Sequence, residues 1–215
     1  MKQIVLILFL CIAGCSFVWG QDVNYYRNPD RIYLDSKDGH QGAFLWKMKK
    51  AGDVTAGAEA VSKPGYETGD WMPAVVPGTV LNSLVYNKVY PEPYYGVNNK
   101  LESKLIPDLS QVGRDFYTYW FRTEFAVPQS FKGKNVWLQL DGINYRAEVW
   151  VNGNLLSTIN GMFIQDYINV TDFVKIGKNN ALAVKVYPVD VPGSTKPKSW
   201  GLRENSIMVV TAISD

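Results

Sequence analysis

The residues that could carry acid–base, metal or nucleophilic chemistry in this sequence are few and scattered. The single histidine, His40, stands in a glycine-flanked turn segment, which excludes a histidine-based metal cluster and argues against a Ser-His-Asp triad. Carboxylates occur singly, so their spacing indicates no general acid and base pair, and there is no phosphate-binding glycine loop and no Cys-x-x-Cys motif. We therefore expect no catalytic residue, no metal and no cofactor in this chain by itself.

The N-terminal segment carries the signals of export. Lys2 precedes an apolar run over residues 4–12, followed by small residues, so residues 1–20 are interpreted as a secretory signal peptide and not as a transmembrane span. Two processing routes fit this segment: cleavage after Gly20, or lipidation of Cys15 in a stretch that resembles a bacterial lipobox. We expect an exported bacterial protein, either periplasmic, secreted or anchored as an outer-membrane lipoprotein.

The remaining chain, residues 21–215, is expected to form one domain with its own hydrophobic core. Both cysteines, Cys11 and Cys15, lie in the signal region, so no disulfide can stabilise the exported part. The whole chain has 22 basic and 20 acidic residues without a basic cluster, which argues against a nucleic-acid partner. Aromatic residues make up 13% of the chain, a share that suits a β-rich protein.

Alternating apolar and polar residues predict a series of β-strands in the second half of the chain. Four segments show this pattern or a dense β-forming composition: 118–126, 136–140, 146–151 and 181–187. Asn152-Gly153 predicts a two-residue hairpin turn, with residues 155–159 as the returning strand. Short strands separated by turns favour a two-sheet antiparallel sandwich.

Helical signals are sparse. Thr79 can cap a short helix whose apolar positions, residues 80, 81, 84 and 85, fall on one face. Residues 171–174 resemble one helical turn. Residues 49–70 are rich in small residues and are expected to form a loop or a weak strand pair.

Five ordered motifs resemble the N-terminal region of glycoside hydrolase family 2. They are the WMPAVVPGTVL stretch at 71–81, PEPYYGVN at 91–98, YWFRTEF at 119–125, GINYRAEVWVNG at 142–153, and the Asn160-Gly161 and Asn169-Val170-Thr171 positions that follow. The branch they resemble most is that of the β-mannosidases and exo-β-glucosaminidases.

The resemblance implies an all-β jelly-roll sandwich of the galactose-binding-like type, with one or two short helices. In such enzymes this domain packs beside an immunoglobulin-like domain and a (β/α)₈ barrel, and the barrel carries the two catalytic glutamates. A barrel takes about 250 residues and cannot fit in this chain. We therefore expect an exo-β-glycosidase domain that is inactive alone, whose partners are those missing domains and a β-linked glycan or its terminal sugar.

The resemblance also singles out candidate ligand-binding residues in the segment from Glu92 to Asn99. In the family this loop approaches the pocket for the terminal sugar. Tyr95 offers an apolar ring, and Asn98 and Asn99 offer amide donors and acceptors, which is how proteins commonly hold sugars. Glu92 stands where the family commonly has aspartate, so its contacts are not expected to transfer unchanged. The alternative is a packed turn-rich loop in which the asparagines support the backbone.

Four residues are candidates for contacts with the missing domains. Asn144 and Tyr145 form a polar corner between two strands, where they either satisfy local backbone groups or dock the sandwich onto the barrel. Trp150 points away from the core valines and is either a second-layer core residue or part of the interface. Trp200 lies where the chain last follows the family pattern.

The C-terminal sequence departs from the family after Gly201. In place of a longer loop and a last conserved strand, the chain reads LRENSIMVVTAISD. Residues 207–213 either form a substitute edge strand or reflect a truncated chain, and we favour truncation. Two other functions remain open: a free-standing carbohydrate-binding module, and an interaction protein that uses an exposed aromatic patch.

Overall fold

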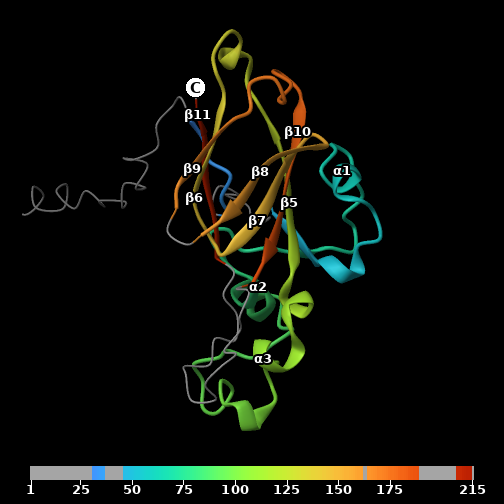
Figure 1. Cartoon of the computed structure of the whole chain (residues 1–215), viewed down its shortest axis with the longest axis vertical. Helices are drawn as coiled ribbons and strands as arrows, with labels where there is room; N and C mark the ends of the chain where they lie inside the picture. The colour runs from blue at the N-terminus through green and yellow to red at the C-terminus, as the bar shows by residue number, and fades with distance from the viewer. Residues whose placement is uncertain (1–30, 37–45, 162–163, 189–206, 215) are drawn as a thin grey trace, which may run out of the picture.

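Two antiparallel β-sheets pack face to face to form the body of the molecule (Figure 1). The structure is a computed structural model and describes residues 31–36, 46–161, 164–188 and 207–214. Their arrangement confirms the expected all-β sandwich.

The first sheet has six strands in the order β3-β2-β5-β10-β7-β8. Their bounds are Met72–Pro73, Lys47–Lys50, Tyr119–Ala126, Asn179–Tyr187, Arg146–Val151 and Asn154–Asn160, respectively. All neighbours are antiparallel, and the long strand β10 lies between β5 and β7. Four of these strands, β5, β7, β8 and β10, were predicted from the sequence, because each carries a clear strand pattern or follows a hairpin signal.

The second sheet follows the order β1-β11-β6-β9, with the short strand β4 also paired to β11. The bounds are Arg31–Ile32 for β1, Ile207–Ser214 for β11, Trp137–Asn144 for β6, Asp166–Asn169 for β9 and Gly78–Thr79 for β4. One of the two alternatives for this region, a substitute edge strand, was half right. Residues 207–214 do form a strand, but it lies inside the sheet, because β6 pairs along one side of it and β1 and β4 pair along the other.

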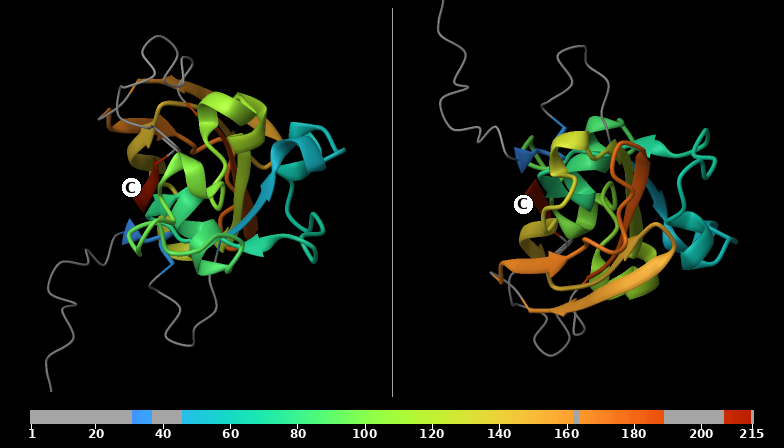
Figure 2. Two further views of the ribbon diagram at one scale, coloured as in Figure 1. Left: turned by 90° about the horizontal axis from the view of Figure 1, so that it is seen from below. Right: turned by 90° about the horizontal axis from the view of Figure 1, so that it is seen from above.

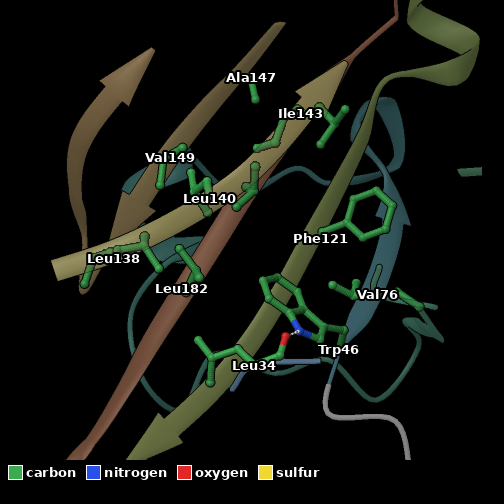
Figure 3. Packing of buried hydrophobic residues seen from close by; sticks show 14 of the residues in the cluster. Leu34, Trp46, Val76, Phe121, Leu138, Leu140, Ile143, Ala147, Val149 and Leu182 are labelled. Atoms are coloured by element: carbon green, nitrogen blue, oxygen red, sulfur yellow. Dashed lines mark hydrogen bonds between the residues drawn. The ribbon is translucent and has the colours of Figure 1, made fainter. Parts of the chain in front are cut away.

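The main hydrophobic core fills the space between the two sheets (Figure 3). Leu138 and Leu140 of β6 face Val149 of β7 and Leu182 of β10, and all four side chains are buried. The buried Trp46 indole N–H has a hydrogen-bond partner within the core, because it donates to the Leu34 carbonyl at 2.6 Å. Burial of alternate residues is the consequence of the period-two pattern seen in the sequence.

The hairpin between β7 and β8 turns at Asn152 and Gly153, as the sequence predicts. Both have positive φ, 49° and 91°, as a two-residue turn of this type requires. Asn152 also donates to the Asn180 side chain at 2.7 Å and accepts from the Ala181 amide at 2.9 Å. The Asn180 amide is fully buried and itself bonds the Lys175 and Lys178 carbonyls, so the hairpin is fixed to the turn before β10.

Residues 51–70 form a second layer on the outer face of the six-stranded sheet. The expectation of a loop or weak strand pair was right in part, because most of the stretch is loop and turn, but it missed two short helical elements. They contain a 3₁₀ turn, η2 (Ala51–Asp53), and a short helix, α1 (Ala58–Val61). Val61 packs with Trp71, Trp120 and Ala183 in a small core separate from the main one. The stretch shows no helical or strand period in its sequence, and contacts with the distant strands β5 and β10 hold it in place.

Helices α2 and α3, with the 3₁₀ turns between and after them, lie at one end of the sandwich, which Figure 2 shows from below in its left view. Helix α2 (Val80–Tyr86) begins as predicted, with the Thr79 hydroxyl accepting from the Asn82 amide at 2.8 Å. Helix α3 (Leu109–Val112) and the 3₁₀ turns η3 (Leu101–Ser103) and η4 (Arg114–Tyr117) follow it, and η5 (Gln129–Phe131) follows β5. The described residues thus hold three short α-helices where one or two were expected. Residues 171–174 form a hydrogen-bonded turn and no helix.

Candidate functional site

Residues 87–117, which we term the lobe, project from the end of the sandwich beyond α2 (Figure 1). The base of the lobe is anchored in the main core: Leu109 and Tyr117 are fully buried there, and Tyr90 packs against it. The Tyr117 hydroxyl donates to the Pro107 carbonyl. Burial raises the pKa of Tyr90, partly offset by a hydrogen bond with Tyr117, so the Tyr90 hydroxyl is neutral at physiological pH.

The tip of the lobe, residues 91–105, is shaped by its own hydrogen bonds. The Asn98 side chain donates to the Glu92 carbonyl at 2.9 Å, and the Tyr94 amide donates to the Glu92 carboxylate at 3.3 Å. The Asn98 amide donates to the Tyr95 carbonyl at 3.2 Å. Two of the four candidate ligand residues, Glu92 and Asn98, therefore support the loop backbone with part of their hydrogen-bonding capacity.

The same tip exposes apolar side chains, of which the sequence analysis singled out only Tyr95. Tyr94 is 92% exposed and Tyr95 is 76% exposed, while Asn99 beside them is also exposed. Further exposed large apolar residues of α2 and the lobe are Tyr86, Val89, Val97, Leu101 and Leu105. One indication of this exposure lies in the sequence: the apolar residues follow no helical or strand period and lie in a segment rich in Pro, Gly and Asn.

The corner Asn144-Tyr145 joins β6 to β7 at this end of the sandwich. The peptide bond between the two residues is cis, and the Tyr145 carbonyl accepts from the Gly161 amide at 2.8 Å. Within the described part of the chain, the buried Asn144 Oδ1 has no hydrogen-bond partner. Ile207 pairs with both Asn144 and Thr79, so the corner and the start of α2 flank the same strand end.

The remaining candidates are dispersed. Trp150 is half-buried on the outer face of the six-stranded sheet, where it packs against the small core under α1. Trp200, Cys15 and His40 lie outside the described residues. The structure thus brings the lobe and the corner to one end and places Trp150 on a sheet face.

Across residues 31–36, 46–161, 164–188 and 207–214, no group of three or more His, Cys, Asp or Glu side chains could hold a metal ion. In the same ranges, no helix has the length and apolar character needed to cross a membrane. The fold defines the class: a galactose-binding-like β-sandwich domain, here with a projecting lobe.

The family follows from comparison with known proteins. Residues 46–204 match the glycosyl hydrolase 2 galactose-binding domain-like family, and the chain belongs to it. It is an N-terminal domain of the type found in β-mannosidases and exo-β-glucosaminidases, as the sequence motifs predict.

Three relatives illustrate this type. A mannosylglycoprotein endo-β-mannosidase of Lilium longiflorum is 41% identical over 135 residues, which cover 63% of this chain and 14% of that protein. An exo-β-D-glucosaminidase of Amycolatopsis orientalis is 32% identical over 144 residues, covering 66% of this chain and 13% of that protein. A solved exo-β-D-glucosaminidase superimposes with a TM-score of 0.66 at 25% identity, covering 86% of this chain and 20% of that one. The chain therefore spans about one seventh of the length of the first two relatives.

Proposed function

We propose that this chain is the non-catalytic sugar-binding domain of an exported glycoside hydrolase family 2 exo-β-glycosidase of the β-mannosidase or exo-β-glucosaminidase type. Residues 1–20 direct export, with either Gly20 or Cys15 as the processing site. The lobe and the Asn144-Tyr145 corner dock onto the catalytic part of the enzyme. The tip of the lobe completes the pocket for the terminal sugar of a β-linked glycan.

The observation that carries this proposal is the concentration of exposed apolar surface on α2 and the lobe. Seven of the eleven exposed large hydrophobic residues in the described ranges belong to residues 86–105. Such a concentration marks an interaction surface, because soluble proteins rarely leave large apolar patches in water. The relatives are several times longer than this chain, so the rest of such an enzyme is the natural occupant of this surface.

The sugar-contacting role rests on the side chains that remain available at the tip. The exposed Tyr95 ring provides a flat apolar face, and the exposed Asn99 amide can both donate and accept hydrogen bonds. Glu92 and Asn98 hold the loop in shape, so they preorganise the contact and reduce its entropic cost.

A chimaera tests the docking role. We would replace the matching segment of the Amycolatopsis orientalis exo-β-glucosaminidase with residues 46–204 and measure kcat and KM on an aryl β-glucosaminide. A folded, active chimaera is expected. Tyr94→Ala should weaken domain association, and Tyr95→Ala should raise KM several-fold. Leu155→Ala, an exposed leucine on β8, is the control and should change neither. Full activity of the Tyr94→Ala/Tyr95→Ala chimaera would contradict the proposal.

The absence of activity in the chain alone is tested directly. The purified chain should hydrolyse neither 4-nitrophenyl β-D-mannoside nor the corresponding β-glucosaminide, because retaining hydrolysis needs two rigidly held carboxyls about 5 Å apart. Turnover that follows the chain through every purification step would refute a non-catalytic role.

A further inference from the structure

The chain contains two Asn-Gly pairs, which lie at the two ends of strand β8. Asn152-Gly153 forms the turn before β8, and Asn160-Gly161 stands where β8 ends. Asparagine followed by glycine is chemically unstable in water, because the backbone nitrogen of the next residue can attack the side-chain carbonyl carbon. Glycine has no Cβ to obstruct that approach and allows the backbone conformation it needs. The two pairs are alike in sequence, so their surroundings decide which of them reacts.

The side-chain amide of Asn152 is held on both sides. Its Nδ2 donates to the Phe173 carbonyl and to Asn180 Oδ1, at 2.7 Å each, and its Oδ1 accepts from the Ala181 amide at 2.9 Å. Asn180 is itself fully buried, so this partner is fixed in place. The amide must turn towards the Gly153 nitrogen before it can react, and that rotation breaks all three hydrogen bonds. The hairpin therefore protects Asn152.

The side-chain amide of Asn160 has no such support. It is exposed, and within the described part of the chain no hydrogen bond holds it. The attacking nitrogen is held by its backbone pairing, in which the Gly161 N–H donates to the Tyr145 carbonyl at 2.8 Å. This bond lies beyond the last β7–β8 residue pair, Arg146 with Asn160, and strand ends open more readily than strand centres. Fraying of a strand end thus frees Asn160 to react, whereas three side-chain bonds must break to free Asn152.

We propose that Asn160 is a site of spontaneous deamidation in the folded protein and that Asn152 is protected from it. When the strand end opens, the Gly161 nitrogen gives its proton to water and bonds to Asn160 Cγ. The Cγ–Nδ2 bond then breaks, and Nδ2 takes up a proton and leaves as ammonia. The resulting succinimide adds one water at either of its carbonyls, which restores the N–H and gives aspartate or isoaspartate at residue 160. Water is the co-reactant, and the net change converts an amide and water into a carboxylic acid and ammonia.

The two products differ in what they do to the structure. Aspartate keeps the main chain and places a carboxylate at the position opposite Arg146, an opposite-charge pairing that costs the sheet little. Isoaspartate carries the main chain through the former side chain and so adds one methylene group to it. The Gly161 amide then no longer matches the Tyr145 carbonyl, and the corner between β6 and β7 loosens. This change does not depend on the docking role of the corner.

Comparison of the folded and the unfolded chain tests the proposal. The full chain is kept at physiological temperature in mildly alkaline buffer, with and without concentrated urea, because attack requires a deprotonated glycine nitrogen. Chymotryptic cleavage at Leu155 and Leu156 separates the two pairs, so mass spectrometry quantifies each of them. In urea the two asparagines should react at similar rates. In buffer alone Asn160 should react at least about tenfold faster than Asn152, because of the additional hydrogen bonds that protect Asn152.

Two variants at residue 160 identify the reaction and its consequence. Asn160→Gln lengthens the side chain, so ring closure is far slower and residue 160 should stay unchanged through the same incubation. Asn160→Asp reproduces the aspartate product and should keep the melting temperature of the unaltered chain. Aged protein also contains isoaspartate, which methylation by an isoaspartyl methyltransferase measures, and it should melt at a lower temperature than Asn160→Asp.

Two outcomes would overturn the assignment of the site. One is that Asn160 stays intact in buffer while the sample in urea is fully converted. The other is that Asn152 reacts as fast as Asn160 in buffer. Equal melting temperatures of isoaspartate-containing protein and Asn160→Asp would refute the loosening of the corner.

Discussion

At the scale of single residues, Arg122 connects the second layer to the sheet. Its side chain is 4% exposed, and it donates to the carbonyls of Val61 and Lys63 at 2.8 Å each, as well as to the Glu124 carboxylate. The Val61 carbonyl is the last of α1, where helical carbonyls lack partners within the helix, and the Lys63 carbonyl lies in the turn that follows. One forked guanidinium therefore both caps α1 and fixes it to β5.

Replacement of Arg122 should destabilise the protein markedly. Arg122→Met removes the side-chain donor of the Val61 carbonyl and one of the donors of both the Lys63 carbonyl and the Glu124 carboxylate. This loss should lower the free energy of unfolding by about 3 kcal/mol. Arg122→Lys should cost less, about 1–2 kcal/mol, because one ammonium keeps the charge but cannot reproduce the fork. Urea denaturation followed by tryptophan fluorescence measures both. A loss below about 1 kcal/mol for Arg122→Met would contradict this role.

Glu124 should make stability depend on pH in the acid range. Burial alone would raise the pKa of Glu124, but hydrogen bonds from Arg122, the Gly65 amide and Asn179 and the charge of Arg122 together lower it below the ordinary 4.5. A pKa lowered by folding means that the ionised carboxylate stabilises the folded state. That contribution is complete above the unfolded pKa and is lost as pH falls through the folded pKa.

The measurement is a pair of urea titrations, of the unaltered chain and of Glu124→Gln, at several pH values from about 7 down to about 3. The stability difference between them should be largest near neutral pH and should shrink below pH 4.5. A difference that stays constant over this range would show that Glu124 contributes no pH dependence.

At the scale of elements, the β7–β8 hairpin depends both on the backbone conformation of its turn residues and on their contacts with distant parts of the chain. Gly153 has a φ of +91°, and an added Cβ would lie 2.9 Å from the Lys63 Cε of the second layer. The turn therefore needs glycine mainly for its backbone conformation, since a lysine side chain can move aside. Asn152 needs its amide as well, because it bonds both Asn180 and Ala181.

Gly153→Ala should destabilise the protein by about 1 kcal/mol, the cost of holding a residue with a Cβ at positive φ. Gly69→Ala is the matched control: no atom lies within 4 Å of its added Cβ, so its effect should be neutral or slightly stabilising. Thermal unfolding monitored by circular dichroism compares the two. Equal melting temperatures of the two variants would contradict a conformational requirement at residue 153.

At the scale of the whole molecule, the sandwich combines a well-packed interior with an apolar projection. The lobe base is buried at Leu109 and Tyr117, whereas its tip exposes Tyr94 and Tyr95. Because this tip exposes apolar side chains to water, we expect it to bind another protein surface, and without a partner the domain should self-associate.

Self-association of the chain alone is therefore expected to depend on concentration. Sedimentation velocity should show reversible oligomers at high micromolar concentration, and the double change Tyr94→Ser/Tyr95→Ser should shift the distribution towards monomer. Leu155→Ser removes an exposed leucine elsewhere and should leave the distribution unchanged. A strictly monomeric unaltered chain would indicate that the lobe tip needs no cover.

Local signals in the sequence were sufficient for much of this molecule. The period of two predicted strands β6 and β7, and a dense β-forming composition predicted β5 and β10. Asn152-Gly153 predicted the hairpin, and Thr79 predicted the start of α2. The ordered motifs predicted the family and the sandwich, because they record turns, caps and core positions that lie close together in sequence.

Only the tertiary structure decided where the aperiodic segments go. Residues 51–70 gain their helix from Arg122, which lies 61 residues from Val61, and residues 207–214 gain an interior place in their sheet from β6, β1 and β4. The exposure of Tyr94 and the clustering of Glu148 with Tyr187 likewise depend on how remote segments pack. Sequence alone determined which segments could be strands, turns or capped helices, since those choices are made by neighbouring residues. Contacts between residues far apart in the chain determined the layers and surfaces, because no local pattern encodes them.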